Sequence, residues 1–98
     1  MSILTKKAKG QECLVRVPGI CCWNPETTVA AHLNGAGVGI KHHDMFAAWA
    51  CADCHVWLDG GYTRDYDRDY RDLLHLKGMF RTQQKLLDAG LILIKGEK

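Results

Sequence analysis

The chain has 98 residues, of which 47% are hydrophobic and 24% are charged, and its formal net charge is +2. This length predicts a single domain over residues 1–98, and the composition argues against wholesale disorder. The small net charge excludes an overwhelming basic field, although a local cluster of basic residues would still permit contact with nucleic acid. No stretch reaches the roughly 20 apolar residues that are needed to span a bilayer.

The N-terminus and the cysteine count together predict a reduced compartment. Lys6, Lys7 and Lys9 precede no apolar run of the kind found in a secretory signal, so we expect a cytoplasmic protein. The five cysteines are an odd number, and in a reduced protein they favour metal ligation over disulfides. A metal staple would also suit a short chain, because such a chain buries only a modest part of its surface.

The N-terminal part predicts a loose basic lead-in over residues 1–10, followed by a short β-hairpin. Cys13 to Val17 are mostly β-prone, Pro18-Gly19 is a turn signal, and Ile20 to Trp23 would form the returning strand. The hairpin would therefore carry a cysteine near each end.

A second β-prone run covers residues 27–33. Its alternation places His32 on the face opposite Val29 and Ala31. The glycine-rich segment that follows, residues 34–39, predicts a loop that can approach a ligand closely.

Two short helical segments are predicted next. Asp44 is a plausible N-cap for the apolar run over residues 45–50. A second helix is predicted over Cys51 to Asp59 and would end at Gly60-Gly61. Its inward-facing residues would be Cys54, Trp57 and Leu58, with Asp53 toward water.

A long helix is predicted from an N-cap at Thr63 to about Ala89, with Gly90 beyond its end. Residues of opposite charge lie three and four positions apart on its outer face. His75 is interpreted as a surface or boundary residue. Leu91 to Ile94 predict a terminal strand or a docking segment. The proposed apolar stripe of the helix, at helical spacing, comprises Tyr66, Tyr70, Leu73, Leu74, Lys77, Phe80, Gln84 and Leu87.

The cysteines predict a zinc site. Cys51-x-x-Cys54 has the spacing of one pair of zinc ligands, and Cys13 with either Cys21 or Cys22 would supply the second pair. The second pair is more widely spaced than usual. The alternative is that the cysteines near the N-terminus are simply small buried apolar residues.

Two other cofactor chemistries use the same residues. Cys51-x-x-Cys54-His55 also matches the attachment pattern of c-type haem, for which Met45 or Met79 would be an axial ligand. Haem attachment requires export, which the N-terminus argues against. A thioredoxin-like dithiol would require a βαβ context, which the predicted order of elements does not provide.

Histidines and carboxylates near this stretch predict a second metal site. His55 and Asp59 are four residues apart on a predicted helix, so both face one side and suit a divalent cation with open positions for water and phosphate. A neutral His32 imidazole could take a proton from water that attacks phosphorus. Each residue considered alone has a simpler interpretation. His32 would be a polar residue on the strand surface, and Asp59 would stabilise the end of the helix.

The order of strand, histidine, glycine-rich loop and Cys-x-x-Cys-His helix resembles the HNH (His-Me finger, ββα-metal) nucleases. More closely, the chain resembles the YbcO-like nuclease family of phages and prophages. The matching segments cover most of the chain from Lys7 to Ile94 and are residues 10–21 (GQECLVRVPGIC), 24–27 (NPET), 31–32 (AH), 50–55 (ACADCH) and 78–83 (GMFRTQ).

The resemblance implies a set of roles for named residues. It implies that His32 is the general base and that His55 binds the catalytic metal, while Asp44 takes the place of the residue that orients the base. Asp59 stands where some members carry a second helix histidine. The structural zinc would be bound by Cys13, Cys21, Cys51 and Cys54, which leaves Cys22 as a spare thiol.

One position departs from the HNH pattern. These enzymes usually carry an acidic or histidine metal ligand directly before the general base, and this chain has Ala31 there. The catalytic metal would then depend on His55, Asp59 and one of Asp44, His42 or His43. This departure favours the alternative of a zinc module that binds DNA or protein without catalysis.

Together these observations predict a small α+β domain, in which a zinc-stapled ββα-metal unit is braced by one long helix. The expected function is metal-dependent hydrolysis of DNA phosphodiesters in phage recombination or DNA processing, in the host cytoplasm if the protein is phage-encoded. The expected cofactors are a structural Zn²⁺ and a catalytic Mg²⁺ or another divalent cation. The residues expected to contact DNA phosphates are Lys7, Lys9, Arg16 and Arg81.

Overall fold

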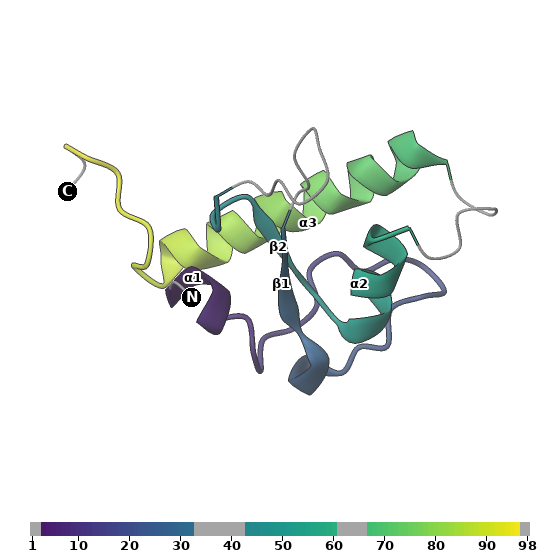
Figure 1. Ribbon diagram of the computed structural model, residues 1–98. Helices are drawn as coiled ribbons and strands as arrows, with labels where there is room; N and C mark the ends of the chain where they lie inside the picture. Colours follow the sequence, from purple (N-terminus) through teal and green to yellow (C-terminus); the bar gives the residue numbers. More distant parts are fainter. Residues whose placement is uncertain (1–2, 33–42, 61–66, 97–98) are drawn as a thin grey trace.

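The computed structural model describes residues 3–32, 43–60 and 67–96 (Figure 1). A two-stranded sheet lies against one long helix, and shorter helices stand on either side of the strands. None of the described helices is long and apolar enough to cross a membrane. In chain order the elements are α1 (Ile3–Lys6), the 3₁₀ helix η1 (Pro25–Thr27), β1 (Val29–His32), β2 (Ala47–Ala50), α2 (Ala52–Leu58) and α3 (Arg68–Asp88).

The sheet pairs β1 and β2 in antiparallel register, from Val29 opposite Ala50 to His32 opposite Ala47. The strand predicted over residues 27–33 is therefore confirmed for residues 29–32, whereas Thr27 belongs to η1 and Leu33 lies outside the described residues. The helical prediction for residues 45–50 is wrong, because the last four residues of this run form β2, and all four are buried. The packing of β2 against both β1 and α3 overrides the helical preference of its alanines.

The predicted N-terminal hairpin is also wrong. The Cys13–Val17 segment is an irregular buried loop, and Leu14 N–H donates to the carbonyl of Trp49 at 2.8 Å. Arg16 has a φ of 55°, which is incompatible with a continuous strand. The predicted turn after Val17 is present, since the N–H groups of Ile20 and Cys21 both donate to the Val17 carbonyl.

The N-terminal lead-in and the C-terminal segment are both packed onto the domain. The lead-in is not loose, because it contains α1 and because Ala8 is buried against Leu14, Trp49 and Leu86. Leu91 and Ile92 are partly buried on the same cluster without forming a strand, so the docking alternative for this segment is the correct one.

Helix α3 buries a different face from the predicted one. It begins after Asp67, whose carboxylate accepts the Tyr70 N–H at 2.7 Å, and it ends before Ala89 and Gly90. The predicted cap at Thr63 lies outside the described residues. Most of the predicted stripe is exposed, including Phe80 at 73%. The buried residues are His75, Gly78, Thr82 and Leu86.

Three of the four buried residues of α3 are small or polar, and the helix approaches β2 closely there. A Cβ atom at Gly78 would lie 2.8 Å from Val15 Cγ2 and 3.2 Å from Ala48 Cβ. The Thr82 hydroxyl accepts the Trp49 N–H at 2.9 Å and donates to the Gly78 carbonyl at 2.8 Å. A search for apolar residues alone passes over such a face.

Candidate functional site

Four cysteines converge where the loop before β1 meets the start of α2. The Sγ atoms of Cys13, Cys21, Cys51 and Cys54 all lie within 4.8 Å of one another, and three of these residues are fully buried. Cys51 is the N-cap of α2, and Cys54 lies on the first turn, as the Cys-x-x-Cys spacing predicted. Of the two neighbouring cysteines, Cys21 belongs to the cluster, whereas Cys22 is exposed.

The cluster has the dimensions of a tetrahedral metal site. Zn–S bonds of about 2.3 Å place two sulfur ligands about 3.8 Å apart in a tetrahedron. The sulfur atoms of Cys51 and Cys21 are 3.8 Å apart. The backbone N–H groups of Cys22 and Cys54 both donate to Cys51 Sγ at 3.4 Å, which fixes the position of this sulfur. The four residues therefore fit a metal ion such as zinc.

The ionisation of the thiols supports this fit. Hydrogen bonding from Cys54 lowers the pKa of Cys13 to about 4, whereas burial raises the pKa of Cys21 to about 12. The pKa of Cys54 is also raised, first by its hydrogen bond to Cys13 and then by burial. One thiolate thus opposes ionisation of its neighbours, and a divalent cation is the group that would stabilise several thiolates together.

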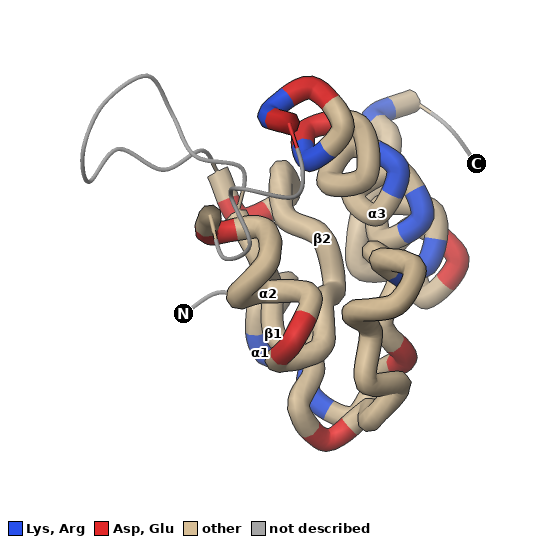
Figure 2. Tube along the Cα trace, turned by 90° about the vertical axis from the view of Figure 1, so that its right-hand side faces the viewer, with Lys and Arg blue, Asp and Glu red and all other residues tan. Residues whose placement is uncertain are grey.

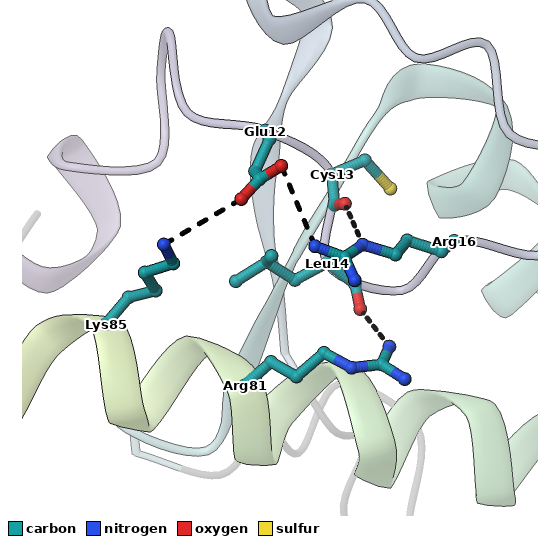
Figure 3. Close-up of polar contacts among 6 residues, drawn as sticks. All are labelled: Glu12, Cys13, Leu14, Arg16, Arg81 and Lys85. Atoms are coloured by element: carbon teal, nitrogen blue, oxygen red, sulfur yellow. Dashed lines mark hydrogen bonds and ion pairs between the residues drawn. The ribbon is translucent and has the colours of Figure 1, made fainter.

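Basic side chains that were predicted to contact DNA hold the cysteine loop in place (Figure 3). Arg16 Nε donates to the Cys13 carbonyl at 3.3 Å, and Arg81 donates to the Leu14 carbonyl at 2.7 Å. Glu12 pairs with Arg16 at 3.6 Å and with Lys85 at 3.8 Å. These contacts give both arginines a structural function, and their contact with DNA stays a prediction.

His32 and Asp44 form a hydrogen-bonded pair at the end of β1. His32 Nε2 lies 2.6 Å from Asp44 Oδ1, and both side chains are partly exposed, at 18% and 31%. An ionised carboxylate only accepts hydrogen bonds, so Nε2 carries the hydrogen and the lone pair of the neutral ring is on Nδ1. The pair therefore has the geometry of an oriented base. Asp44 does not act as a helix cap.

His55 and Asp59 form a second, more exposed pair on α2. His55 Nε2 lies 3.4 Å from Asp59 Oδ2, with the side chains 41% and 61% exposed. Helix α2 contacts both β1 and α3 (Figure 1). His43 is exposed, and its Nδ1 accepts the Met45 N–H, while His42 lies outside the described residues.

His75 is a buried residue that the sequence interpretation placed at the surface. It is only 7% exposed, and its Nε2 donates to the carbonyl of Ala31 at 2.9 Å, directly before His32. Its pKa is lowered mainly by burial, against the opposing effects of the Ala31 carbonyl, Asp72 and Asp59, while His55 lowers it further. No local sequence signal marked it, because the buried face of α3 consists mainly of small and polar residues.

The lowered pKa of His75 predicts that the fold loses stability in mild acid. The unfolded chain takes up a proton at this position below about pH 6.5, whereas the folded state resists it, so stability falls as the pH drops toward the folded pKa. The His75→Gln variant keeps a donor for Ala31 but does not titrate. Urea unfolding of both metal-loaded proteins at pH 7.5 and 5.5 should show a smaller pH effect in the variant, by up to about 1.4 kcal/mol per pH unit. An equal pH effect in both proteins would contradict this assignment.

The fold and the site define a class: a small α+β domain with a two-stranded sheet, a long C-terminal helix and a four-cysteine cluster that can bind a metal ion. The family model described as "Putative nuclease YbcO" matches residues 2–91. The chain belongs to this family of phage and prophage proteins.

Similar proteins agree with this assignment. "Putative nuclease YbcO" of Escherichia coli (strain K12) is 43% identical over 95 residues, covering 94% of this chain and 98% of the relative. "Putative nuclease ybcO" of Enterobacteria phage 82 matches with the same identity and coverage. A solved structure described as "Structure of a putative bacteriophage protein from Escherichia coli str. K-12 substr. MG1655" has a TM-score of 0.75 and 41% identity. The match covers 89% of this chain and 99% of that one.

Proposed function

We propose that this protein is an HNH-type endonuclease that hydrolyses DNA phosphodiesters with the help of a divalent cation. The observation that carries the proposal is the 2.6 Å contact between His32 Nε2 and Asp44 Oδ1, which leaves Nδ1 as the proton acceptor. The matching relatives both carry the printed name "Putative nuclease", which supports the same reaction class.

In this proposal His32 accepts the proton of the attacking water through Nδ1. Asp44 keeps the ring in the required tautomer and orientation and stabilises the positive charge that the ring gains. Without the carboxylate the imidazole could rotate or place its hydrogen on Nδ1. The pair is therefore a base together with the residue that positions it.

His55 and Asp59 are the proposed ligands of the catalytic cation, either Mg²⁺ or another divalent ion. One imidazole nitrogen and one carboxylate oxygen, both exposed, fit a cation that keeps positions for water and phosphate. When bound, the cation would stabilise the negative charge that develops on the phosphate. Ala31 supplies no ligand, since its methyl side chain has no donor atom, so the protein would hold this cation with few groups.

The four-cysteine cluster is proposed to hold a structural zinc that takes no part in the chemistry. It joins the loop around Cys13 and Cys21 to the start of α2. Because α2 has only seven residues, it depends on tertiary anchoring to present His55 and Asp59.

Supercoiled plasmid nicking tests this function. Purified protein with its cysteine-bound metal intact should nick only when Mg²⁺ or Mn²⁺ is added, and the His55→Ala/Asp59→Ala double variant should nick far more slowly while keeping the same zinc content. Absence of nicking by the wild-type protein with any added metal, alongside measurable DNA binding, would favour a non-catalytic binding module. The buried alanine before His32 is the observation that favours this second candidate.

A further inference from the structure

A groove of about 510 Å³ lies between α1 and β1, and His32 forms part of its lining. It follows the edge of β1 that has no strand partner within the described residues, and α1 lies beside this strand (Figure 1). The strand residues in the lining extend from Thr28 to His32, and at roughly 3.3 Å per residue this path is about 13 Å long. The groove is therefore long enough to hold a short stretch of an extended polymer.

The groove has a positive lining. Lys6 and Lys9 both contribute to it, against a single carboxylate, that of Glu26. Within the described ranges neither lysine makes an ion pair, in contrast to Arg16 and Lys85, which pair with Glu12. On α3, by comparison, acidic and basic positions are interleaved (Figure 2). The two lysines are thus available to a phosphate-bearing ligand.

Thr28, a residue of the groove lining, carries a buried hydroxyl that has no partner among the described residues. Thr28 is 2% exposed and lines the groove, and its Oγ1 makes no hydrogen bond to any part of the chain that the structure describes. An unpaired buried hydroxyl is unfavourable, and rotation of the Thr28 side chain toward the groove would let it hydrogen-bond to a ligand oxygen. This feature is independent of the lysines and indicates a polar ligand.

We propose that the groove between α1 and β1 binds the phosphodiester backbone of one DNA strand and leads it to His32. Lys6 and Lys9 contact phosphates, and the Thr28 hydroxyl hydrogen-bonds to the strand. This inference rests on the proposed nuclease function and adds the path of the substrate to it. It also transfers the main DNA-binding role from the two arginines of the cysteine loop to the lysines of the N-terminal segment.

The test compares two double variants that remove the same charge. Lys6→Gln/Lys9→Gln alters the groove, whereas Lys77→Gln/Lys95→Gln alters exposed lysines outside the groove lining. Affinity for a fluorescent oligonucleotide is measured by anisotropy over a range of salt concentrations, without Mg²⁺. The slope of log K against log[salt] should become shallower by about two in the groove variant, as expected for two lost phosphate contacts, and should change little in the control.

The Thr28→Val variant tests the hydroxyl separately. It should weaken DNA binding by about twofold to tenfold, as for one lost hydrogen bond, without lowering the thermal stability of the DNA-free protein. Two results would overturn this inference: equal slopes of log K against log[salt] in the two double variants, or unchanged DNA affinity after Thr28→Val. If the wild-type protein still nicks DNA, the nuclease function stands. Wild-type protein that neither binds nor nicks DNA would overturn both.

Discussion

The Cys54→Ser variant is expected to lose its metal and to have no cooperative unfolding transition at 25 °C. Structural zinc contributes about 10–16 kcal/mol in small zinc-binding domains, whereas a domain of this kind has a total stability of about 5–15 kcal/mol. Cys54 is fully buried and is surrounded by three other cysteines. Water therefore cannot reach this position to replace the lost sulfur ligand. Elemental analysis and circular dichroism during urea titration measure both effects.

The chain supplies a matched control for this experiment. Cys22 is an exposed thiol next to Cys21 that lies outside the four-cysteine cluster, and its backbone N–H donates to Cys51 Sγ. The Cys22→Ser variant should therefore keep one zinc per chain and wild-type stability. If Cys54→Ser unfolds at the same urea concentration as Cys22→Ser, the cluster is not the staple of the fold.

The His32→Ala variant is expected to lose about 10²- to 10⁴-fold in the rate of plasmid nicking, the usual contribution of a general base. Binding of DNA should remain, because the lysines of the groove are unchanged. The imidazole is partly exposed and is not part of the buried clusters, so fold and zinc content should also remain. Single-turnover nicking rates, measured beside DNA affinity, separate the two properties.

Two further variants distinguish a base from a residue with only a structural role. Added imidazole should restore part of the activity of His32→Gly, because the missing group is a proton acceptor in a partly exposed position. Asp44→Asn should lower the rate without abolishing DNA binding, since it removes the carboxylate that orients the ring. A His32→Ala protein that nicks at the wild-type rate would contradict the assigned mechanism.

The metal cluster could be predicted from sequence because its chemistry is local. The spacing of Cys51 and Cys54 places both on the start of one helix, and a reduced chain with unpaired thiols favours metal ligands. The choice between Cys21 and Cys22 could not be made in this way. It depends on the turn after Val17, which directs one cysteine inward and the next outward.

The incorrect predictions share a cause, which is that contacts distant in sequence decide the conformation. The Cys13–Val17 segment has β-prone residues, yet Arg16 in the left-handed region and the Arg81 side chain on the Leu14 carbonyl hold it as a loop. His75 belongs to the buried face of α3 because it reaches the Ala31 carbonyl, 44 residues away in sequence. Neither contact has a local sequence signal.

The contact of Gly78 with Val15 and Ala48 limits how this family can diverge. A single added methyl group at residue 78 would overlap Val15 Cγ2 at 2.8 Å and crowd Ala48 Cβ at 3.2 Å, so three positions share one volume. A lineage can enlarge one of them only after another has become smaller or has moved. Exchanges that are neutral in one relative would therefore be harmful when transplanted alone into this chain, and the three positions should evolve as a coupled set.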